Sequence, residues 1–145
     1  MILISHRGNI NGPNKDRENS PDYILEALQN YHVEIDVWLI NGQFMLGHDV
    51  PTYITNGLFL SNPKLWCHAK NLEALVAMQH FSSIHCFWHQ NDDVTLTSRN
   101  YIWTYPGKQI ASERAIAVVP EQVEFNWDIS MAYGVCSDYV QRYKD

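Results

Sequence analysis

The sequence predicts a parallel α/β fold, and two observations support this. Short apolar runs typical of strands alternate with helical patterns in the order strand, helix, strand, strand, helix, strand. Polar side chains also gather directly after predicted strands, which is where the sites of parallel α/β folds form. The chain has 145 residues and shows no long linker or internal repeat. We therefore expect a single domain over residues 1–145.

The N-terminal half contains the clearest elements. Ser20 and Pro21 predict a helix start, because a hydroxyl N-cap is followed by proline at the first helical position. Asn41-Gly42 predicts a hairpin turn, since both residues tolerate positive φ. A second helix is expected over residues 72–81, with Asn71 as its cap. The expected strands are residues 1–5, 32–40, 43–46 and 65–69, and the segments 8–20 and 50–63 are expected to be loops.

The C-terminal half is less regular and predicts short strands with little helix. A short helix is expected over residues 126–133. The expected strands are residues 83–88, 101–105, 115–119 and 134–139. Trp88, Trp103 and Tyr105 either fill the core or line the mouth of a site.

Composition narrows the functional classes. The formal net charge is −6, which disfavours general nucleic-acid binding because phosphate backbones are repelled. The three cysteines are far apart and lie in apolar runs, so we expect free, buried thiols. No apolar stretch approaches the ~20 residues that span a bilayer, and the N-terminus does not resemble a signal peptide. We expect a cytoplasmic protein without stable membrane insertion.

Glu34 and Asp36 form the first candidate site. They are two residues apart in a predicted strand, so both side chains point to one face of the sheet. Two neighbouring carboxylates repel each other unless a cation joins them, and oxygen ligands suit Mg²⁺ or Ca²⁺. Taken alone, the pair is equally well interpreted as an exposed, solvated strand face.

The other candidate residues also follow predicted strands. His6 and His48 can exchange protons near neutral pH and are candidates for general acid and base. Arg7 can grip a phosphate oxygen through its planar guanidinium, and Lys70 can hold a second one. Each of these four, taken alone, is more often a structural or solvated side chain.

Together these residues resemble the glycerophosphodiester phosphodiesterase family, within the phospholipase C-like phosphodiesterases. The matching blocks are His6-Arg7-Gly8, Glu18-Asn19-Ser20, Glu34-Ile35-Asp36 and His48-Asp49. The run Gly134-Val135-Cys136-Ser137-Asp138 is similar to a C-terminal family motif. The third-strand motif, Glu-x-Lys in the family, reads His68-Ala69-Lys70 here.

The resemblance implies a TIM-barrel-like (β/α) fold. Since such barrels usually need ~200 residues or more, we expect a reduced barrel with some helices shortened or missing, whose exposed edges an oligomer could cover. It also implies a divalent metal held by Glu34, Asp36 and a third-strand residue, which here is His68. A histidine ligand makes Mn²⁺ or Zn²⁺ more favourable beside Mg²⁺ or Ca²⁺.

The function implied is a metal-dependent phosphoric diester hydrolase of lipid metabolism, acting on glycerophosphodiesters. A substrate hydroxyl would attack the phosphorus and form a cyclic phosphate, with His6 and His48 as the acid–base pair, Arg7 and Lys70 on phosphate oxygens, and water opening the ring. Three alternatives stay open: a phosphotransferase similar to the venom sphingomyelinase D enzymes, a degenerate homologue that only binds metal or phosphate, and an unrelated structural protein. The substrate head group is not predicted.

Overall fold

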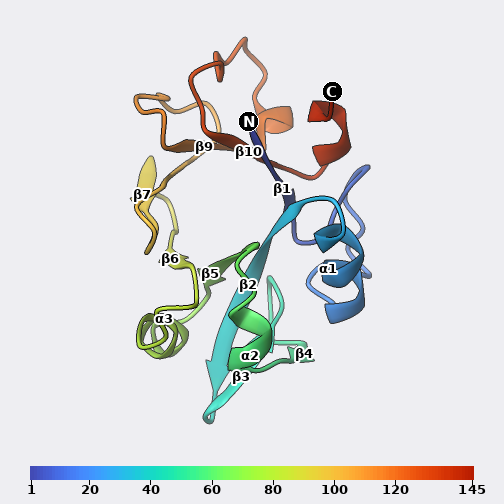
Figure 1. The fold of residues 1–145 in the computed structure, drawn as a ribbon, viewed down its shortest axis with the longest axis vertical. Coiled ribbons are helices and arrows are strands. Elements are labelled where there is room, and N and C mark those ends of the chain that lie inside the picture. The colour runs from blue at the N-terminus through green and yellow to red at the C-terminus, as the bar shows by residue number, and fades with distance from the viewer.

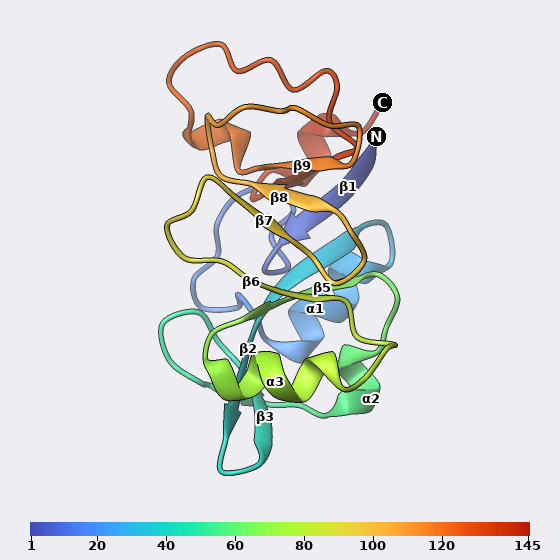
Figure 2. The same ribbon diagram turned by 90° about the vertical axis from the view of Figure 1, so that its left-hand side faces the viewer.

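Ten strands form one curled, mostly parallel sheet, which the two ribbon views show from perpendicular directions (Figures 1 and 2). The computed structural model describes all residues from 1 to 145. The strands are β1 (Ile2–His6), β2 (His32–Ile40), β3 (Gln43–Leu46), β4 (Tyr53–Ile54), β5 (Leu65–Ala69), β6 (Cys86–Trp88), β7 (Val94–Leu96), β8 (Ile102–Thr104), β9 (Ala115–Val118) and β10 (Gly134–Ser137).

Parallel pairing runs continuously from β6 through β5, β2, β1, β10 and β9 to β8. The first and last long segments of the chain therefore meet, because β1 pairs with β10 and not with a strand close in sequence. Antiparallel strands extend this run at two places: β7 pairs with β8, and the β3–β4 ribbon extends from the second half of β2. In Figure 1 both termini lie at the same end of the molecule.

The expected (β/α) barrel is wrong. Only three short α-helices occur, α1 (Pro21–Leu28), α2 (Gly57–Leu60) and α3 (Leu72–Gln79), together with the 3₁₀ turns Pro120–Gln122 and Val140–Tyr143. No α-helix follows β6, so the second half of the molecule is a curled sheet without alternating helices. The connections on either side of β7, residues 89–93 and 97–101, are too short for a helix that could cover a strand, and the longer connections after β8 and β9 contain only the 3₁₀ turn Pro120–Gln122.

The helix expected over residues 126–133 is also absent, and the sequence contains the reason. Apolar and polar residues alternate from Val123 to Met131, which is a period of two and not the helical period. The segment is irregular, and Trp127 and Ile129 pack against a small cluster formed by Ala117, Ala132 and Val135. Two strands and one helix, β4, α2 and β7, occur where no element was expected.

The elements expected in the first half are confirmed, and their local signals act as the sequence predicts. The Ser20 hydroxyl accepts a hydrogen bond from the Tyr23 N–H at the start of α1. The Asn71 side chain caps α3 by accepting from the Ala74 N–H. Asn41 and Gly42 both have positive φ, so the β2–β3 hairpin closes in two residues.

Each face of the sheet packs its own hydrophobic cluster. The larger one packs alternate residues of β2 and β5, such as Ile35 and Cys67, against the three helices. The other packs the opposite face and includes Ile4, Phe87 and Trp103. Glu34 and Asp36 alternate with the first set, so they lie on the inner face of the curled sheet, away from the helices.

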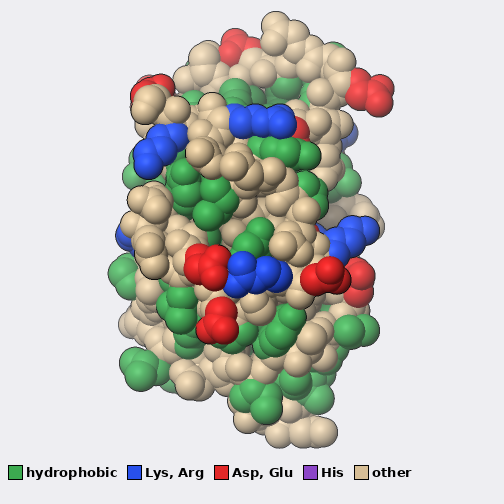
Figure 3. Space-filling view, turned by 90° about the vertical axis from the view of Figure 1, so that its right-hand side faces the viewer, with side chains coloured by type: hydrophobic (Ala, Val, Ile, Leu, Met, Phe, Trp, Pro, Cys, Tyr) green, Lys and Arg blue, Asp and Glu red, His purple; other side chains and the backbone are tan.

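The three cysteines are free and buried, as expected. None of the helices has the length and apolar character needed to cross a membrane. Acidic and basic side chains are interspersed on the face seen in Figure 3, and neither sign gathers into a patch there.

Candidate active site

Strand register brings four of the predicted site residues side by side on the inner face. His6, the last residue of β1, is in register with Glu34 of β2. Asp36, two residues further along β2, is in register with His68 of β5. Because these strands are parallel and adjacent, the two imidazoles flank the two carboxylates, with His6 and His68 near the carboxyl ends of β1 and β5 and the carboxylates in the first half of β2.

The two carboxylates are almost fully buried and are not fully satisfied. Glu34 is 2% exposed and Asp36 is 0% exposed. Glu34 Oε2 and Asp36 Oδ1 have no hydrogen-bond partner. Burial and the neighbouring Asp36 raise the pKa of Glu34 to about 7. Burial also raises the pKa of Asp36, but His68 and Arg7 outweigh it and hold that pKa below its ordinary value.

His68 completes a group that can hold a cation. Its Nε2 lies 2.8 Å from the His89 carbonyl oxygen, and a carbonyl only accepts, so Nε2 carries a proton. The other nitrogen, Nδ1, lies 3.3 Å from Asp36 Oδ1 and 3.9 Å from Glu34 Oε1. A proton on Nδ1 or a metal ion bound to Nδ1 would each satisfy the two carboxylates; burial lowers the pKa of His68, but Asp36 and Glu34 outweigh it and raise that pKa.

The spacing of these atoms suits a divalent ion. One ligand atom from each of Glu34, Asp36 and His68 lies within 4.8 Å of the others. Ligand atoms that each lie ~2.0–2.6 Å from one ion are separated from one another by up to about twice that distance, which matches this limit. The two carboxylate oxygens without partners, the His68 Nδ1 and the backbone carbonyl that orients the His68 ring all fit a metal ligand set.

His6 is held by a partner that sequence analysis assigned no role. Its Nδ1 donates to Asp138 Oδ1 at 2.7 Å, which leaves Nε2 directed toward Glu34 Oε2 at 3.6 Å. Asp138 Oδ1 also accepts from the Asn9 amide at 2.9 Å. Burial lowers the pKa of His6, but the hydrogen bond to Asp138 and the charge of Glu34 outweigh it, so the pKa is raised.

A second carboxylate, that of Glu121, contacts the backbone at Asp138. Glu121 accepts from the Asp138 backbone N–H at 2.8 Å and from the Ser137 hydroxyl at 3.0 Å. Glu121 follows Val119, a β-branched residue with φ of 39° in the left-handed region. The sharp turn at the end of β9 therefore carries Glu121 to the end of β10, where it fixes the backbone that presents Asp138.

Arg7 is fixed between two acidic side chains. Its Nε lies 3.2 Å from Asp36 Oδ2 and its Nη1 donates to Glu18 Oε1 at 3.2 Å. Glu18 Oε2 accepts from the Asn9 amide, which ties this pair to the His6 side of the site. The Asn19 side chain accepts from the Asp36 N–H and donates to Asp36 Oδ2, each at 2.9 Å. These contacts orient Arg7 and one metal-ligating carboxylate together.

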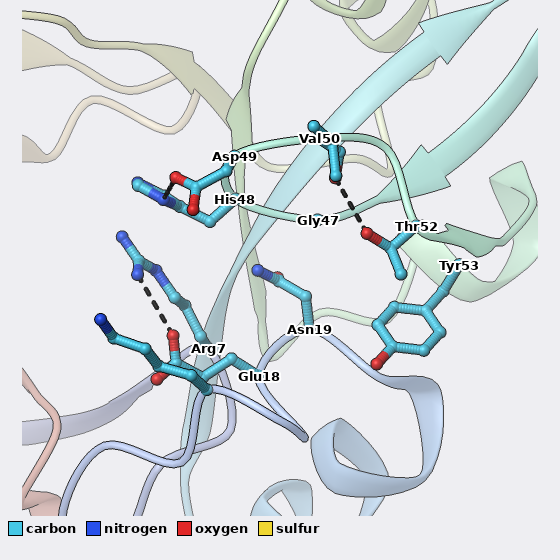
Figure 4. Close-up of a pocket in the computed structure, with 10 residues that line it drawn as sticks. Arg7, Glu18, Asn19, Gly47, His48, Asp49, Val50, Thr52 and Tyr53 are labelled. Carbon is cyan, nitrogen blue, oxygen red and sulfur yellow. Dashed lines mark hydrogen bonds and ion pairs between the residues drawn. The ribbon is translucent and has the colours of Figure 1, made fainter.

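His48 lies at a second rim of the site, on an exposed loop after the β2–β3 hairpin. Figure 4 shows its ring above the Arg7 guanidinium, with Nδ1 2.8 Å from Asp49 Oδ1. The loop turns sharply at Gly47, where a Cβ would collide with the Val50 carbonyl oxygen. Burial and the charge of Arg7 lower the pKa of His48.

Two adjoining cavities meet at Arg7 and His48, which line both. The inner cavity has a volume of about 250 Å³, and Glu34, His6 and His68 also line it. The outer polar cavity, drawn in Figure 4, has a volume of about 360 Å³. Its other lining residues are mostly polar: Lys15, Glu18, Asn19, Gly47, Asp49, Val50, Thr52 and Tyr53.

The structure places Lys70 away from the cavities and separates the three aromatic residues that were candidates for the mouth of the site. Lys70, expected at the phosphate, lines neither cavity and forms no ion pair. Trp103 and Tyr105 line the inner cavity, whereas Trp88 packs against the larger core cluster. Trp103 also belongs to the inner core, so both interpretations of that residue hold.

Several residues that hold the site residues in place are not among the catalytic, phosphate-binding or metal-binding residues predicted from the sequence. Glu18, Asn19 and Asp138 lie within motif blocks that carry the family resemblance, so a signal for them was present. Asn9 and Glu121 have no comparable signal, because their contribution depends on contacts between distant parts of the chain.

Comparison with known proteins adds no further identification. No family model matches this chain, and neither a curated protein nor a solved structure matches it.

Proposed function

We propose that this chain is a metal-dependent phosphodiester hydrolase that acts on small glycerol phosphodiesters. The observation that carries the proposal is the shared inner cavity. It joins two imidazoles, His6 and His48, to the Arg7 guanidinium and to a buried carboxylate whose Oε2 lacks a partner. Acid, base, anion binder and cation site are the parts that phosphodiester cleavage needs.

The residues divide the chemistry as follows. Glu34, Asp36 and His68 would hold a divalent ion, which would lower the pKa of a bound substrate hydroxyl and neutralise charge on the phosphate. Arg7 binds a phosphate oxygen with the donors that Glu18 and Asp36 leave free.

Proton transfer falls to the two histidines that line the inner cavity. His6 presents Nε2 to the cavity because Asp138 holds Nδ1, and His48 presents its ring from the hairpin loop. One accepts the proton of the attacking hydroxyl and the other protonates the leaving alcohol. A cyclic phosphate is the first product, and attack by water opens it. The chain would work in the cytoplasm, where its free thiols stay reduced.

The test is direct turnover of sn-glycero-3-phosphoethanolamine by the purified chain. Reactions contain Mg²⁺, Mn²⁺, Ca²⁺ or Zn²⁺, and phosphorus NMR follows the products. We expect glycerol phosphate or its cyclic form with at least one ion, and no product in excess chelator. Product in excess chelator would remove the metal from the proposal.

Two further outcomes separate the alternatives. A cyclic phosphate that never opens would identify a phosphotransferase. Metal binding by calorimetry without turnover of any phosphodiester would identify a binding protein. His80→Ala serves as the control variant, because His80 is an exposed histidine at the end of α3 that lines no cavity.

A further inference from the structure

A groove leads outward from the inner cavity along the loop after β8. The inner cavity and a neighbouring cavity of about 390 Å³ share Tyr105, Pro106 and Gln122, so the two adjoin. Phe125 lines the groove but not the inner cavity. The groove is therefore the surface that a molecule bound at the candidate active site would contact if it extended past the three shared residues.

Aromatic rings mark the path from the metal-ligating group to this groove. The His68 ring is 6.4 Å from the His89 ring, and the His89 ring is 5.6 Å from the Tyr105 ring. Tyr105 is 42% exposed and Phe125 is 63% exposed, although both are large apolar side chains. An exposed apolar surface beside a polar site is typical of a ligand-binding groove.

Local structure fixes these rings in place. The Lys108 N–H donates to the Tyr105 carbonyl, and Gly107 has φ of 79°, so residues 105–108 form a tight turn with proline second and glycine third. The Phe125 ring lies against Gly107, at the position that a Cβ would occupy. The Trp127 indole N–H donates to the Lys108 carbonyl and closes the loop. These contacts join residues 105–108 to Phe125 and Trp127.

We propose that this groove binds an uncharged apolar or aromatic alcohol, which is the second alcohol of the phosphodiester. This inference rests on the proposed function and names its substrate class. The polar cavity on the other side of Arg7 and His48 suits the glycerol end, whereas Tyr105 and Phe125 suit an apolar body.

The position and charge of the groove support this class over a short amino alcohol. Because Phe125 lines the groove and not the inner cavity, only an alcohol that extends beyond the inner cavity can contact its ring. Glu124, the one charged residue that lines the groove, is exposed to water, where an ion pair contributes little.

The experiment compares glycerol phosphodiesters of ethanol, ethanolamine and 2-phenylethanol, with saturating metal ion. Ethanol and 2-phenylethanol are similar leaving groups, so the ratio of their kcat/KM values reports mainly on binding of the alcohol. We expect the phenylethyl ester to exceed the ethyl ester roughly tenfold, from apolar surface buried on Phe125 and Tyr105. Phe125→Ala should reduce that ratio to about two- to threefold. Phe81→Ala should keep it, because Phe81 is 48% exposed at the end of α3 and lines no cavity.

A binding measurement separates failure of the groove from failure of the proposed function. 2-Phenylethyl phosphate and ethyl phosphate are titrated into ¹⁵N-labelled protein, and the Gly107 amide signal is followed. A larger shift and tighter binding with the phenylethyl compound support the groove even if no ester is hydrolysed. Turnover without a size preference, a preference for the ethanolamine ester, or a Gly107 signal that does not distinguish the two phosphates would overturn the inference.

Discussion

The two rims of the candidate site each carry a histidine bonded to an aspartate, but the surroundings of the two pairs differ. His6 Nδ1 lies 2.7 Å from Asp138, and His48 Nδ1 lies 2.8 Å from Asp49. The Asp138 side chain is 11% exposed, whereas that of Asp49 is 91% exposed. The two distances are similar, but the Asp138 hydrogen bond constrains its histidine more, because water competes far less for the buried pair than for the exposed one.

The difference indicates a division between a fixed arm and an adaptable arm. Asn9 and Glu121 hold Asp138 from two sides, so His6 cannot turn without breaking a buried network. His48 stands on an exposed loop, and the only side chain bonded to its ring is Asp49, which is itself open to water. A preorganised group on one rim and a less constrained group on the other would let the site admit substrate and still align it.

Loss of either histidine is the largest effect we expect. His6→Ala and His48→Ala should each lower kcat by ~10²–10⁴-fold, which is the usual contribution of a general acid or base. Circular dichroism and thermal melting should show that both variants remain folded, and His80→Ala should retain the activity of the unaltered chain. Near-normal kcat in either site variant would remove that histidine from the chemistry.

Acid should weaken metal binding, because protons compete for the ligands. The pKa of Glu34 is about 7 without a cation, and Asp36 and Glu34 raise the pKa of His68 against the effect of burial. Both groups must lose any bound proton when the ion enters. We expect the apparent Kd for Mn²⁺ to rise roughly 10–100-fold between pH 7.5 and 5.5, with proton release detected by calorimetry in two buffers. Glu34→Gln should bind the ion more weakly and flatten the pH dependence. A Kd independent of pH would contradict this ligand set.

The matched aspartates test the comparison of the two rims directly. Asp138→Asn should lower kcat about 10–100-fold, as loss of a buried orienting partner does in other sites, whereas Asp49→Asn should change kcat less than about threefold. Asp138→Asn should also lower the pKa of His6, because the hydrogen bond to Asp138 is the strongest interaction that raises that pKa. An NMR titration of the chelator-treated protein measures that pKa. Equal losses from the two variants would show that burial does not distinguish the rims.

The first half of the molecule could be predicted because its signals are local. Ser20, Asn71 and the Asn41-Gly42 turn each act within a few residues, and the alternation along β2 assigns Glu34 and Asp36 to the inner face. The second half could not be predicted as well, because its strands are three or four residues long and no helix separates them. The helix expected over residues 126–133 is wrong for a different reason, because the alternation from Val123 to Met131 argues against a helix there.

The candidate site could likewise be predicted only where its residues carry local signals. His6, Glu34, Asp36 and His68 were expected together, and the register of β1, β2 and β5 places them together. The position of Asp138 depends on β10 pairing with β1, which joins residues 132 positions apart. Lys70 was expected at the phosphate from its place after a strand, but its side chain lines neither cavity. Strand ends identify where a site forms and not which side chains turn into it.

The smallest effect we expect concerns Glu121, which touches no part of the cavity chemistry and acts only through the end of β10. Its carboxylate accepts from the Asp138 N–H and the Ser137 hydroxyl, and an amide in its place keeps only one accepting oxygen. Glu121→Gln should therefore lower kcat about three- to tenfold while KM stays within about twofold, since the substrate contacts are unchanged. Glu121→Asp, which retains the charge on a shorter side chain, should recover part of the loss. The His6 titration should move in the same direction as in Asp138→Asn but less far. If the Gln variant loses stability in thermal melting while the kcat and pKa of its folded fraction are unchanged, Glu121 supports only the fold and the fixed arm ends at Asp138.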